Sequence, residues 1–387
     1  MRLCQQRIPR HLIAHPSEQN ILTIKSPYFF CTGPHSCVRM QSRQRDTRAK
    51  SSTGSCVAMD EKSDSSRALR VGVFGAGGVG GYLAARLASC GADVTVVARG
   101  EHLQAIKDHG LKLTSISGSC TVLVKATDDP SQVGEMDLAI VACKSWQVET
   151  IAPSLKSWLG PETLVVPTQN GVEAPERLAA QLGKERVLGG YIRIQALVQE
   201  PGHIVHDGLM QAEFGVGALP GAGSFVPKRL QVVKAAFRDA VGLELVLCDD
   251  VWSKMWRKLS AICAYSGVCT ASRSDIGEVV ACPESKGLLV QLLTETLQVA
   301  ISNGVGLPHE EVDGIVKEYE GLAANSPSNT PSLMRDMLAG RPSELDDQLG
   351  AVLRYAARSG TSTPGVAALH AVLLPQERRN RAILAQK

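Results

Sequence analysis

The stretch Leu69-Arg70-Val71-Gly72-Val73-Phe74-Gly75-Ala76-Gly77-Gly78-Val79-Gly80 decides how the folded part of this chain begins. Its first half is a short apolar run typical of a buried β-strand, and its second half matches the pattern G-x-G-x-x-G. Small and apolar residues continue at helical spacing as far as Ser89. A strand that passes through such a turn into a helix is typical of a dinucleotide site, where N–H groups at the helix start hold a pyrophosphate.

The glycines of this turn have separate expected tasks. Gly75 permits the tight turn, Gly77 lets the backbone approach the pyrophosphate, and Gly80 lets the helix pack close to the strand. The residues expected to bind the cofactor here are Gly75, Gly77, Gly78, Val79 and Gly80. The alternative is an ordinary strand-to-helix turn that holds no ligand.

The end of the second expected strand, Ala92–Ala98, indicates which dinucleotide is bound. NAD sites place an acid here for the ribose 2′-hydroxyl, whereas a guanidinium suits the 2′-phosphate of NADP(H). Arg99 directly follows the strand, while the acidic Asp93 lies at the strand's opposite end. We therefore expect NADPH/NADP as the cofactor, with Arg99 on the 2′-phosphate. A solvated surface arginine is the alternative.

Strand and helix patterns continue to alternate beyond this point. They cover Met136–Cys143 (strand), Val148–Leu159 (helix), Thr163–Pro167 (strand) and Glu173–Leu182 (helix), with strands and hairpins over 187–217. Alternation of this kind predicts a doubly wound parallel sheet, whose ligands bind at the carboxyl ends of the strands. Lys144 and Asn170 follow two of these strands and are therefore expected at that edge.

After Cys248 the pattern becomes helical throughout. The expected helices are Val251–Tyr265, Lys286–Asn303, Glu310–Tyr319, Pro331–Leu338, Glu344–Arg358 and Val366–Leu374. We therefore predict an α/β chain with an N-terminal Rossmann-type domain over 67–247 and a C-terminal all-helical domain over 248–387. The active site is expected between them. Spacing permits either Lys254 or Lys258 to face it, and two solvated lysines are the alternative.

Charge separates the first part of the chain from the rest. The whole chain carries +3, yet residues 1–59 hold nine basic and two acidic side chains, so the remainder is mildly acidic. A mildly acidic body argues against nucleic acid as a partner, and no apolar run approaches the roughly 20 residues of a membrane span. We expect residues 1–66 to be a disordered leader or transit peptide for the chloroplast, with the mitochondrion or cytoplasm as alternatives.

Metal binding is not expected from this sequence. The eleven cysteines are scattered without a C-x-x-C pair, and the close pair His203 and His206 has no third ligand nearby in the sequence. The thiols are expected to be reduced and largely buried.

Five ordered motifs make the chain resemble the ketopantoate reductase (2-dehydropantoate 2-reductase) family from about Leu69 to near Leu374. They are GAGGVGG at 75–81 with Arg99 after it, CKSWQ at 143–147, TQNG at 168–171, WRKL at 256–259, and SLMRD at 332–336 with GRPSELD at 340–346.

The resemblance implies a role for each matching residue. Lys258 matches the catalytic lysine that protonates the substrate carbonyl, and Glu344 matches its acidic partner. Ser332 matches a hydroxyl that contacts the substrate, Asn170 an asparagine near the nicotinamide ribose and substrate, and Lys144 a lysine beside the cofactor. Without the resemblance, Ser332 would be interpreted as a helix N-cap and Glu344 as a charge in a helix's first turn.

The chain departs from the family pattern at two positions. The family usually has asparagines four and eight residues after the lysine, where this chain has Ile262 and Ser266. Isoleucine cannot form the hydrogen bond, whose loss costs about 1.5–3 kcal/mol when the partner is charged. Ser266 can replace part of the second contact. The native substrate can therefore be a less polar 2-oxo acid.

The resemblance implies NADPH-dependent reduction of a branched 2-oxo acid, above all 2-dehydropantoate to pantoate, for pantothenate and coenzyme A synthesis. One alternative is a related dehydrogenase acting on another 2-oxo or 3-hydroxy acid. The other is a non-catalytic NADP(H)-binding redox sensor, against which the presence of Lys258 and Glu344 argues. The expected partner is a small molecule, and a homodimer is left open.

Overall fold

The central sheet of this protein is parallel, as the alternation of strands and helices predicts. The computed structural model describes residues 67–208, 211–222 and 225–385, so the expected leader over 1–66 lies outside the described residues. The sheet has the order β5-β2-β1-β6-β7, with β1 in the middle as in dinucleotide-binding sheets. Its strands are β1 (Arg70–Phe74), β2 (Asp93–Val97), β5 (Lys125–Thr127), β6 (Met136–Val141) and β7 (Leu159–Pro167).

Alternate residues of β1 pack on opposite faces of this sheet, because successive side chains of a strand point to opposite sides. Val71 and Val73 belong to the core that α1 (Gly78–Ser89) covers, while Phe74 belongs to the core beneath α4 (Ala174–Leu182). On the second face a Cβ at Gly72 would lie 2.6 Å from the ring of Trp158, so the indole needs glycine there. Helices on both faces confirm the doubly wound arrangement.

The prediction of an α-helix over Val148–Leu159 is wrong for most of these residues. Only Val148–Ile151 (α3) is α-helical, and Ala152–Trp158 continues as a 3₁₀ helix. Pro153 supplies the physical reason, since proline has no N–H with which to continue the α-helical bond pattern. The Glu149 carbonyl, which that bond would have used, instead accepts a hydrogen bond of 3.1 Å from Gln181 Nε2.

Two smaller sheets adjoin the central one, with the orders β4-β3-β10-β9 and β12-β11-β8. Their strands are β3 (Leu111–Ser115), β4 (Cys120–Val122), β8 (Leu188–Arg193), β9 (Ala196–Glu200), β10 (His203–His206), β11 (Ala212–Ala218) and β12 (Leu243–Leu247), and the helices here are α2 (Gly100–His109) and α5 (Phe225–Phe237). The expected hairpin is confirmed by the antiparallel β9 and β10. The strand and helix patterns in the sequence did not predict α2, β3, β4, β5, α5 or β12.

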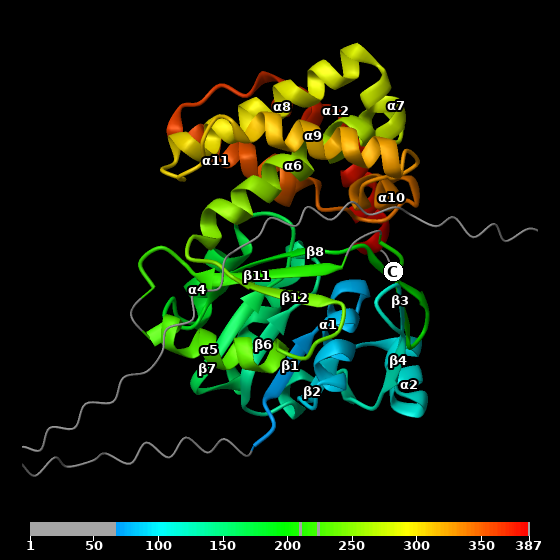
Figure 1. Ribbon diagram of the computed structural model, residues 1–387, viewed down its shortest axis with the longest axis vertical. Helices are drawn as coiled ribbons and strands as arrows, with labels where there is room; N and C mark the ends of the chain where they lie inside the picture. The colour runs from blue at the N-terminus through cyan, green and yellow to red at the C-terminus, as the bar shows by residue number, and fades with distance from the viewer. Residues whose placement is uncertain (1–66, 209–210, 223–224, 386–387) are drawn as a thin grey trace, which may run out of the picture. The chain divides into compact units, whose positions relative to one another are not determined.

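The C-terminal half is helical, as predicted, and α6 leads into it from the sheets (Figure 1). Its helices are α6 (Val251–Ser272), α7 (Ile276–Ala281), α8 (Pro283–Ser302), α9 (Glu311–Asn325), α10 (Ser332–Leu338), α11 (Ala351–Ser359) and α12 (Pro364–Ala385). They share one apolar core, which also takes Val172 and Tyr191 from the first half. The domain limits 67–247 and 248–387 stay predictions.

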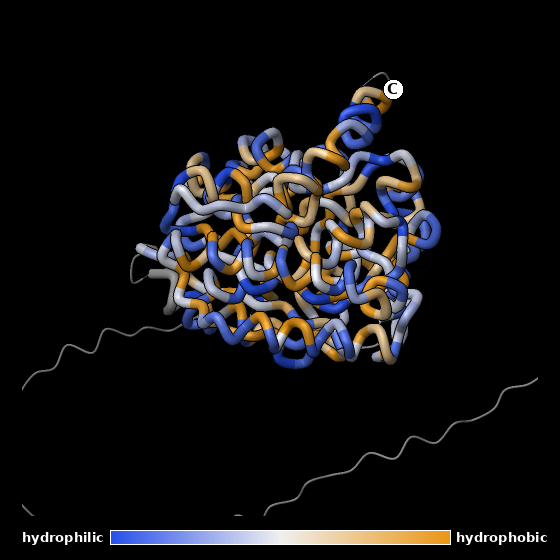
Figure 2. The backbone as a smooth tube through the Cα atoms, turned by 90° about the horizontal axis from the view of Figure 1, so that it is seen from above, coloured by the Kyte–Doolittle hydropathy of each residue, from blue (hydrophilic) through white to orange (hydrophobic). Residues whose placement is uncertain are grey.

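Several of the expected helices differ from their prediction. The helices expected to end at Tyr265 and Tyr319 continue to Ser272 (α6) and Asn325 (α9). The last was expected to end at Leu374, but α12 continues through Pro375, and its final turns extend clear of the other helices (Figure 2). The helix expected from Glu344 begins one residue later and opens with a π-helical turn over Asp346–Gly350. Such turns add one residue to a helical turn and are frequent at functional sites.

Hydrophilic and hydrophobic segments are intermingled along the backbone in Figure 2, as expected where each element has one buried side. No helix among the described residues combines the length and apolar character needed to cross a bilayer.

Candidate active site

The glycine-rich turn between β1 and α1 has the geometry expected of it. Gly75 has a φ of +100°, which only glycine adopts freely, and a Cβ there would lie 3.0 Å from the backbone of Ala142 and Cys143. A Cβ at Gly80 would collide with the Gly75 carbonyl oxygen, so glycine allows α1 to pack against the turn. A Cβ at Gly77 would meet no atom within 4 Å, which leaves open space before the helix N-terminus.

Two further positions of the turn were expected to bind the cofactor. Gly78 begins α1, and a Cβ there would collide with the Ala196 carbonyl oxygen of β9. Val79 lies within the first turn of the helix and is partly exposed. The first N–H groups of α1 have no partners within the helix, so this end suits an anion.

Arg99 lies at the carboxyl end of β2, as predicted, and its side chain is exposed. The guanidinium has neither a hydrogen bond nor an ion pair to any described residue. Its charge acts to lower the pKa of Cys143, the residue beside Gly75, although burial raises the pKa of that thiol to about 12 overall. An exposed cation therefore lies near the glycine turn.

His102 was not predicted from the sequence to belong to the site. Its Nε2 lies 2.7 Å from the Ala76 carbonyl oxygen in the glycine turn, and its Nδ1 accepts a 2.9 Å hydrogen bond from the Gly202 amide. The imidazole therefore holds the turn against the loop before β10. No local spacing signals this contact, because Ala76 and Gly202 are far from His102 in the sequence.

Lys258 lies on α6 and is the lysine that faces inward. Trp256 and Leu259 are fully buried in the helical core, and along the same helix Lys254 is exposed, whereas Lys258, one turn further on, is half-buried. Nζ of Lys258 donates hydrogen bonds of 2.9 Å to Asn170 Oδ1 and 2.7 Å to the Ile192 carbonyl oxygen. Side chain and backbone of the sheet half thus hold an ammonium from the helical half.

Asn170 connects Lys258 to Glu344. Its Nδ2 donates a 3.1 Å hydrogen bond to Glu344 Oε2, which turns Oδ1 of the same amide toward the ammonium. Glu344 is 8% exposed and lies directly before the helix that begins at Leu345. Asn170 was expected beside the cofactor and substrate, and the structure adds that it orients the lysine.

Burial favours the uncharged forms of both Lys258 and Glu344 and shifts their pKa values accordingly. It lowers the pKa of Lys258 to about 8, although the charge of Glu344 acts in the opposite direction. Burial also raises the pKa of Glu344, while Lys144 and the bond from Asn170 act to lower it. An amine with a pKa near 8 can hold a proton at neutral pH and also release it, which suits a general acid.

Lys144 and Ser145 tie the end of β6 to the helical half. Lys144 Nζ lies 2.9 Å from Asp336 Oδ2 on α10, and Ser145 Oγ donates a 2.5 Å hydrogen bond to Asp347 in the π-helical turn. Arg177 on α4 also binds Asp347, at 2.9 Å. The halves are therefore joined by polar contacts on both sides of Glu344.

Cys143 shows that the glycine turn and the lysine cluster share one edge of the sheet. Its backbone lies beside Gly75, and its carbonyl accepts a 2.8 Å bond from Gln169, the residue before Asn170. The charges of Arg99 and Glu344 both act on its thiol. The structure thus brings Lys258, Asn170 and Glu344 together at the expected edge.

Comparison with known families matches this architecture in two parts. The model described as "Ketopantoate reductase PanE/ApbA" matches residues 71–221, and the one described as "Ketopantoate reductase PanE/ApbA C terminal" matches 250–377. The chain belongs to the ketopantoate reductase family. It is therefore an oxidoreductase of this family.

Individual relatives agree with this assignment. A 2-dehydropantoate 2-reductase of Mesorhizobium japonicum is 28% identical over 326 residues, which cover 79% of this chain and 97% of that protein. The solved 2-dehydropantoate 2-reductase of Geobacter metallireducens is 28% identical, with a TM-score of 0.73 over 79% of this chain and 99% of its own. A D-mandelate dehydrogenase solved with NADH and anilino(oxo)acetate is 20% identical, with a TM-score of 0.72 over 81% and 99%, and shows likeness of fold alone.

Three residues predicted from the ketopantoate reductase pattern lie on helices that pack together. Ile262, one turn after Lys258 on α6, is partly buried against the helical core, and Ser266, a further turn on, is 3% exposed. Ser332 is the first residue of α10, which packs on α6. The N-cap of α10 is Pro331, so the interpretation of Ser332 as an N-cap is wrong.

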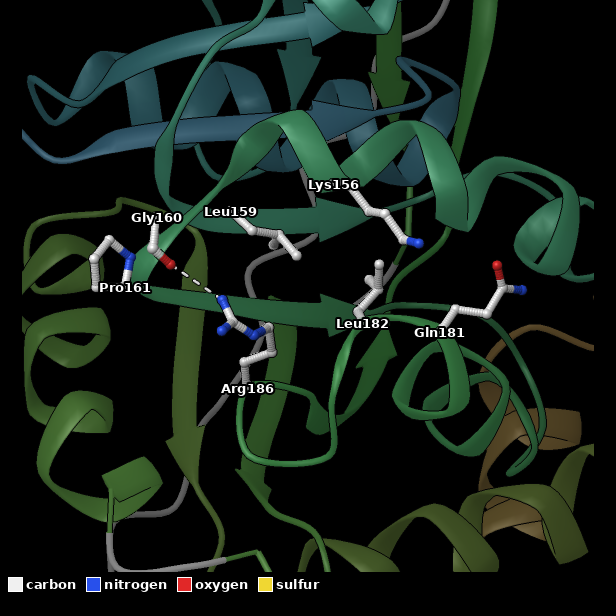
Figure 3. A pocket seen from close by; sticks show the side chains of 7 residues that line it. All are labelled: Lys156, Leu159, Gly160, Pro161, Gln181, Leu182 and Arg186. Atoms are coloured by element: carbon white, nitrogen blue, oxygen red, sulfur yellow. Dashed lines mark hydrogen bonds between the residues drawn. The ribbon is translucent and has the colours of Figure 1, made fainter.

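Two surface hollows lie away from this family's site residues. One is lined by Lys156, Leu159, Gly160, Pro161, Gln181, Leu182 and Arg186, beside the start of β7 (Figure 3). The other borders the first residues of β1, β2, β5 and β6. Both lie at the amino ends of the parallel strands, whereas ligands of such sheets bind at the carboxyl ends.

Proposed function

We propose that this protein reduces a branched 2-oxo acid to the 2-hydroxy acid with NADPH, and that 2-dehydropantoate, giving pantoate, is the first substrate to test. One observation carries the proposal. Among the described residues, Lys258 Nζ has two hydrogen-bond acceptors, the Asn170 amide and the Ile192 carbonyl. An ammonium has three N–H donors, so one remains for a substrate oxygen.

The residues of the glycine turn fit a dinucleotide. The open space at Gly77 and the start of α1 would take the pyrophosphate, and the exposed guanidinium of Arg99 would take a 2′-phosphate. When bound, the nicotinamide supplies a hydride to the substrate's carbonyl carbon. The choice of NADPH over NADH rests on Arg99 alone.

Lys258 would act on the oxygen of the same carbonyl. As negative charge builds on that oxygen, the third N–H of the ammonium stabilises it and then donates its proton. The amine that remains keeps two N–H groups, which match its two acceptors, Asn170 Oδ1 and the Ile192 carbonyl. Glu344 holds the Asn170 amide in the orientation that this requires.

The decisive experiment is NADPH consumption by the purified protein without residues 1–66, across a panel of 2-oxo acids. We expect turnover of 2-dehydropantoate or of a 2-oxo acid with a less polar side chain. Ile262, where the family pattern has an asparagine, supports including the latter. The absence of turnover on the whole panel, from a protein that binds NADPH, would favour a non-catalytic NADP(H)-binding role.

We also propose that residues 1–66 direct the protein to the chloroplast, with the mitochondrion as the alternative. The support is compositional, since residues 1–59 hold nine basic and two acidic side chains without an apolar secretory region. Fusion of these residues to a fluorescent reporter tests the proposal. A reporter that stays in the cytoplasm would contradict it.

A further inference from the structure

Arg193 ends β8 directly beside the proposed catalytic lysine. Lys258 Nζ donates its 2.7 Å bond to the carbonyl of Ile192, the residue before Arg193. Ile192 packs in the core of the sheet half, whereas Tyr191 packs in the core of the helical half. Because side chains alternate along a strand, Arg193 lies on the same side as Tyr191, the side from which Lys258 approaches.

The guanidinium of Arg193 is weakly engaged. Its side chain is 47% exposed, and among the described residues its one ion-pair partner is Glu318 on α9, at 3.6 Å. Glu318 is held more closely by Arg257, at 2.7 Å. No hydrogen bond joins the Arg193 guanidinium to a described residue, so its N–H groups are available to an anion.

Glu213, the acidic residue opposite Arg193, does not neutralise the charge of its guanidinium. Glu213 pairs with Arg193 in the β8–β11 ladder, but its carboxylate accepts a 2.7 Å hydrogen bond from the Tyr191 hydroxyl. Within the described part of the chain no ion pair connects Glu213 to Arg193. The charge of Arg193 does reach the ammonium, because it contributes to lowering the pKa of Lys258.

The chemistry of a 2-oxo acid fits this placement. Its ketone and carboxylate are on adjacent carbons, so the group that binds the carboxylate must lie close to the group that protonates the ketone. Ile262 offers no hydrogen bond for that purpose, while a guanidinium binds a carboxylate through two parallel N–H donors. A bound carboxylate would also offset the like charges of Arg193 and Lys258.

We propose that Arg193 binds the carboxylate of a 2-oxo acid whose ketone oxygen faces Lys258, and that Ile262 contacts the apolar remainder of that substrate. This rests on the proposed reductase function and extends it, because it names what recognises the acid group. The substrate class is then a 2-oxo acid with an apolar branched side chain.

The test compares Arg193→Ala and Arg193→Lys with the unchanged enzyme on the best 2-oxo acid of the panel and on its neutral methyl ester. For Arg193→Ala we expect KM for the acid to rise about 10- to 100-fold, as for the loss of a charged hydrogen bond, with kcat and NADPH affinity little changed. KM for the ester should stay within about twofold. Arg193→Lys should recover part of the acid affinity because it retains the charge.

Arg67→Ala is the matched control, since Arg67 is also half-exposed with an ion pair, to Asp137, at the amino edge of the sheet. It should leave both KM values unchanged. An Arg193→Ala enzyme with unaltered KM for the acid, or with equal losses on acid and ester, would overturn the inference while the reductase function stands. If the unchanged enzyme reduces no 2-oxo acid, both proposals fail together.

Discussion

The pKa of Lys258 is set by two opposing effects, its burial and the charge of Glu344. Burial lowers the pKa of its ammonium to about 8, and Glu344 opposes that shift across Asn170. Spacing alone could not distinguish Lys258 from Lys254, because both lie on the same helix one turn apart. The family resemblance selected Lys258, and the structure distinguishes it from the exposed Lys254 because Lys258 is half-buried and bonded to Asn170 and the Ile192 carbonyl.

Reduction should weaken as pH rises through about 8. The general acid is the protonated amine, which predominates below its pKa and is lost above it. Oxidation of the 2-hydroxy acid needs the neutral amine as a base and should strengthen over the same range. Initial-rate measurements of kcat/KM for reduction and for oxidation between pH 6 and 10 check this. A kcat/KM for reduction that stays constant up to pH 10 would contradict it.

Arg99→Asp should change the cofactor preference. It removes the exposed guanidinium at the end of β2 and places a carboxylate where NAD sites have one. We expect kcat/KM for NADPH to fall by at least about tenfold, as for a lost charged hydrogen bond, while that for NADH is retained or improved. Arg67→Ala serves again as the control. An unaltered ratio of the two cofactors would remove Arg99 from the 2′-phosphate site.

Among the helices and strands, those that local sequence patterns indicate were predicted, whereas those that depend on pairing with a distant strand were not. The strand, turn and helix over 69–89 follow from apolar runs and glycines that are neighbours in the sequence. By contrast, β12 is only five residues long, and it is defined by its pairing with β11. The spacing of apolar residues in the sequence does not indicate that pairing. Proline was not a consistent guide to helix ends: Pro153 interrupts a predicted α-helix, whereas α12 continues through Pro375.

The glycine turn allows a paired test at this scale. A Cβ at Gly80 would collide with backbone, so Gly80→Ala should destabilise the fold by about 1–3 kcal/mol and lower both Tm and NADPH affinity. A Cβ at Gly77 would meet no protein atom within 4 Å, so Gly77→Ala should keep the Tm but weaken NADPH binding. Thermal unfolding and fluorescence titration separate the two effects. Equal Tm losses in both variants would contradict this account of the turn.

At the scale of the whole molecule, the site exists only where two halves of the chain meet. Asn170 and Ile192 come from the sheet half, and Lys258 and Glu344 from the helical half. The ordered family motifs predicted Asn170, Lys258 and Glu344, but not Ile192, which takes part through its backbone carbonyl. It could not predict that Asn170 bridges lysine and glutamate, because that bridge joins residues 88 and 174 positions apart.

The Arg354 side chain shows how the halves are held in this arrangement. Its Nε and one terminal nitrogen bind the Glu173 carboxylate at 2.8 and 2.7 Å, beside the contacts of Asp347 with Ser145 and Arg177. Two parallel N–H donors fix orientation as well as distance. These contacts between α11, the π-helical turn and α4 keep Glu344 within reach of Asn170.

The most direct test of the account is the rate of hydride transfer in Lys258→Ala beside Lys254→Ala, which changes an exposed lysine one turn away on α6. NADPH oxidation in a single turnover with the best 2-oxo acid should be about 10²- to 10⁴-fold slower in Lys258→Ala and unchanged in Lys254→Ala, with NADPH affinity retained in both. A Lys258→Ala enzyme that folds, binds NADPH and reduces the acid at the unchanged rate would show that Lys258 is not the proton donor.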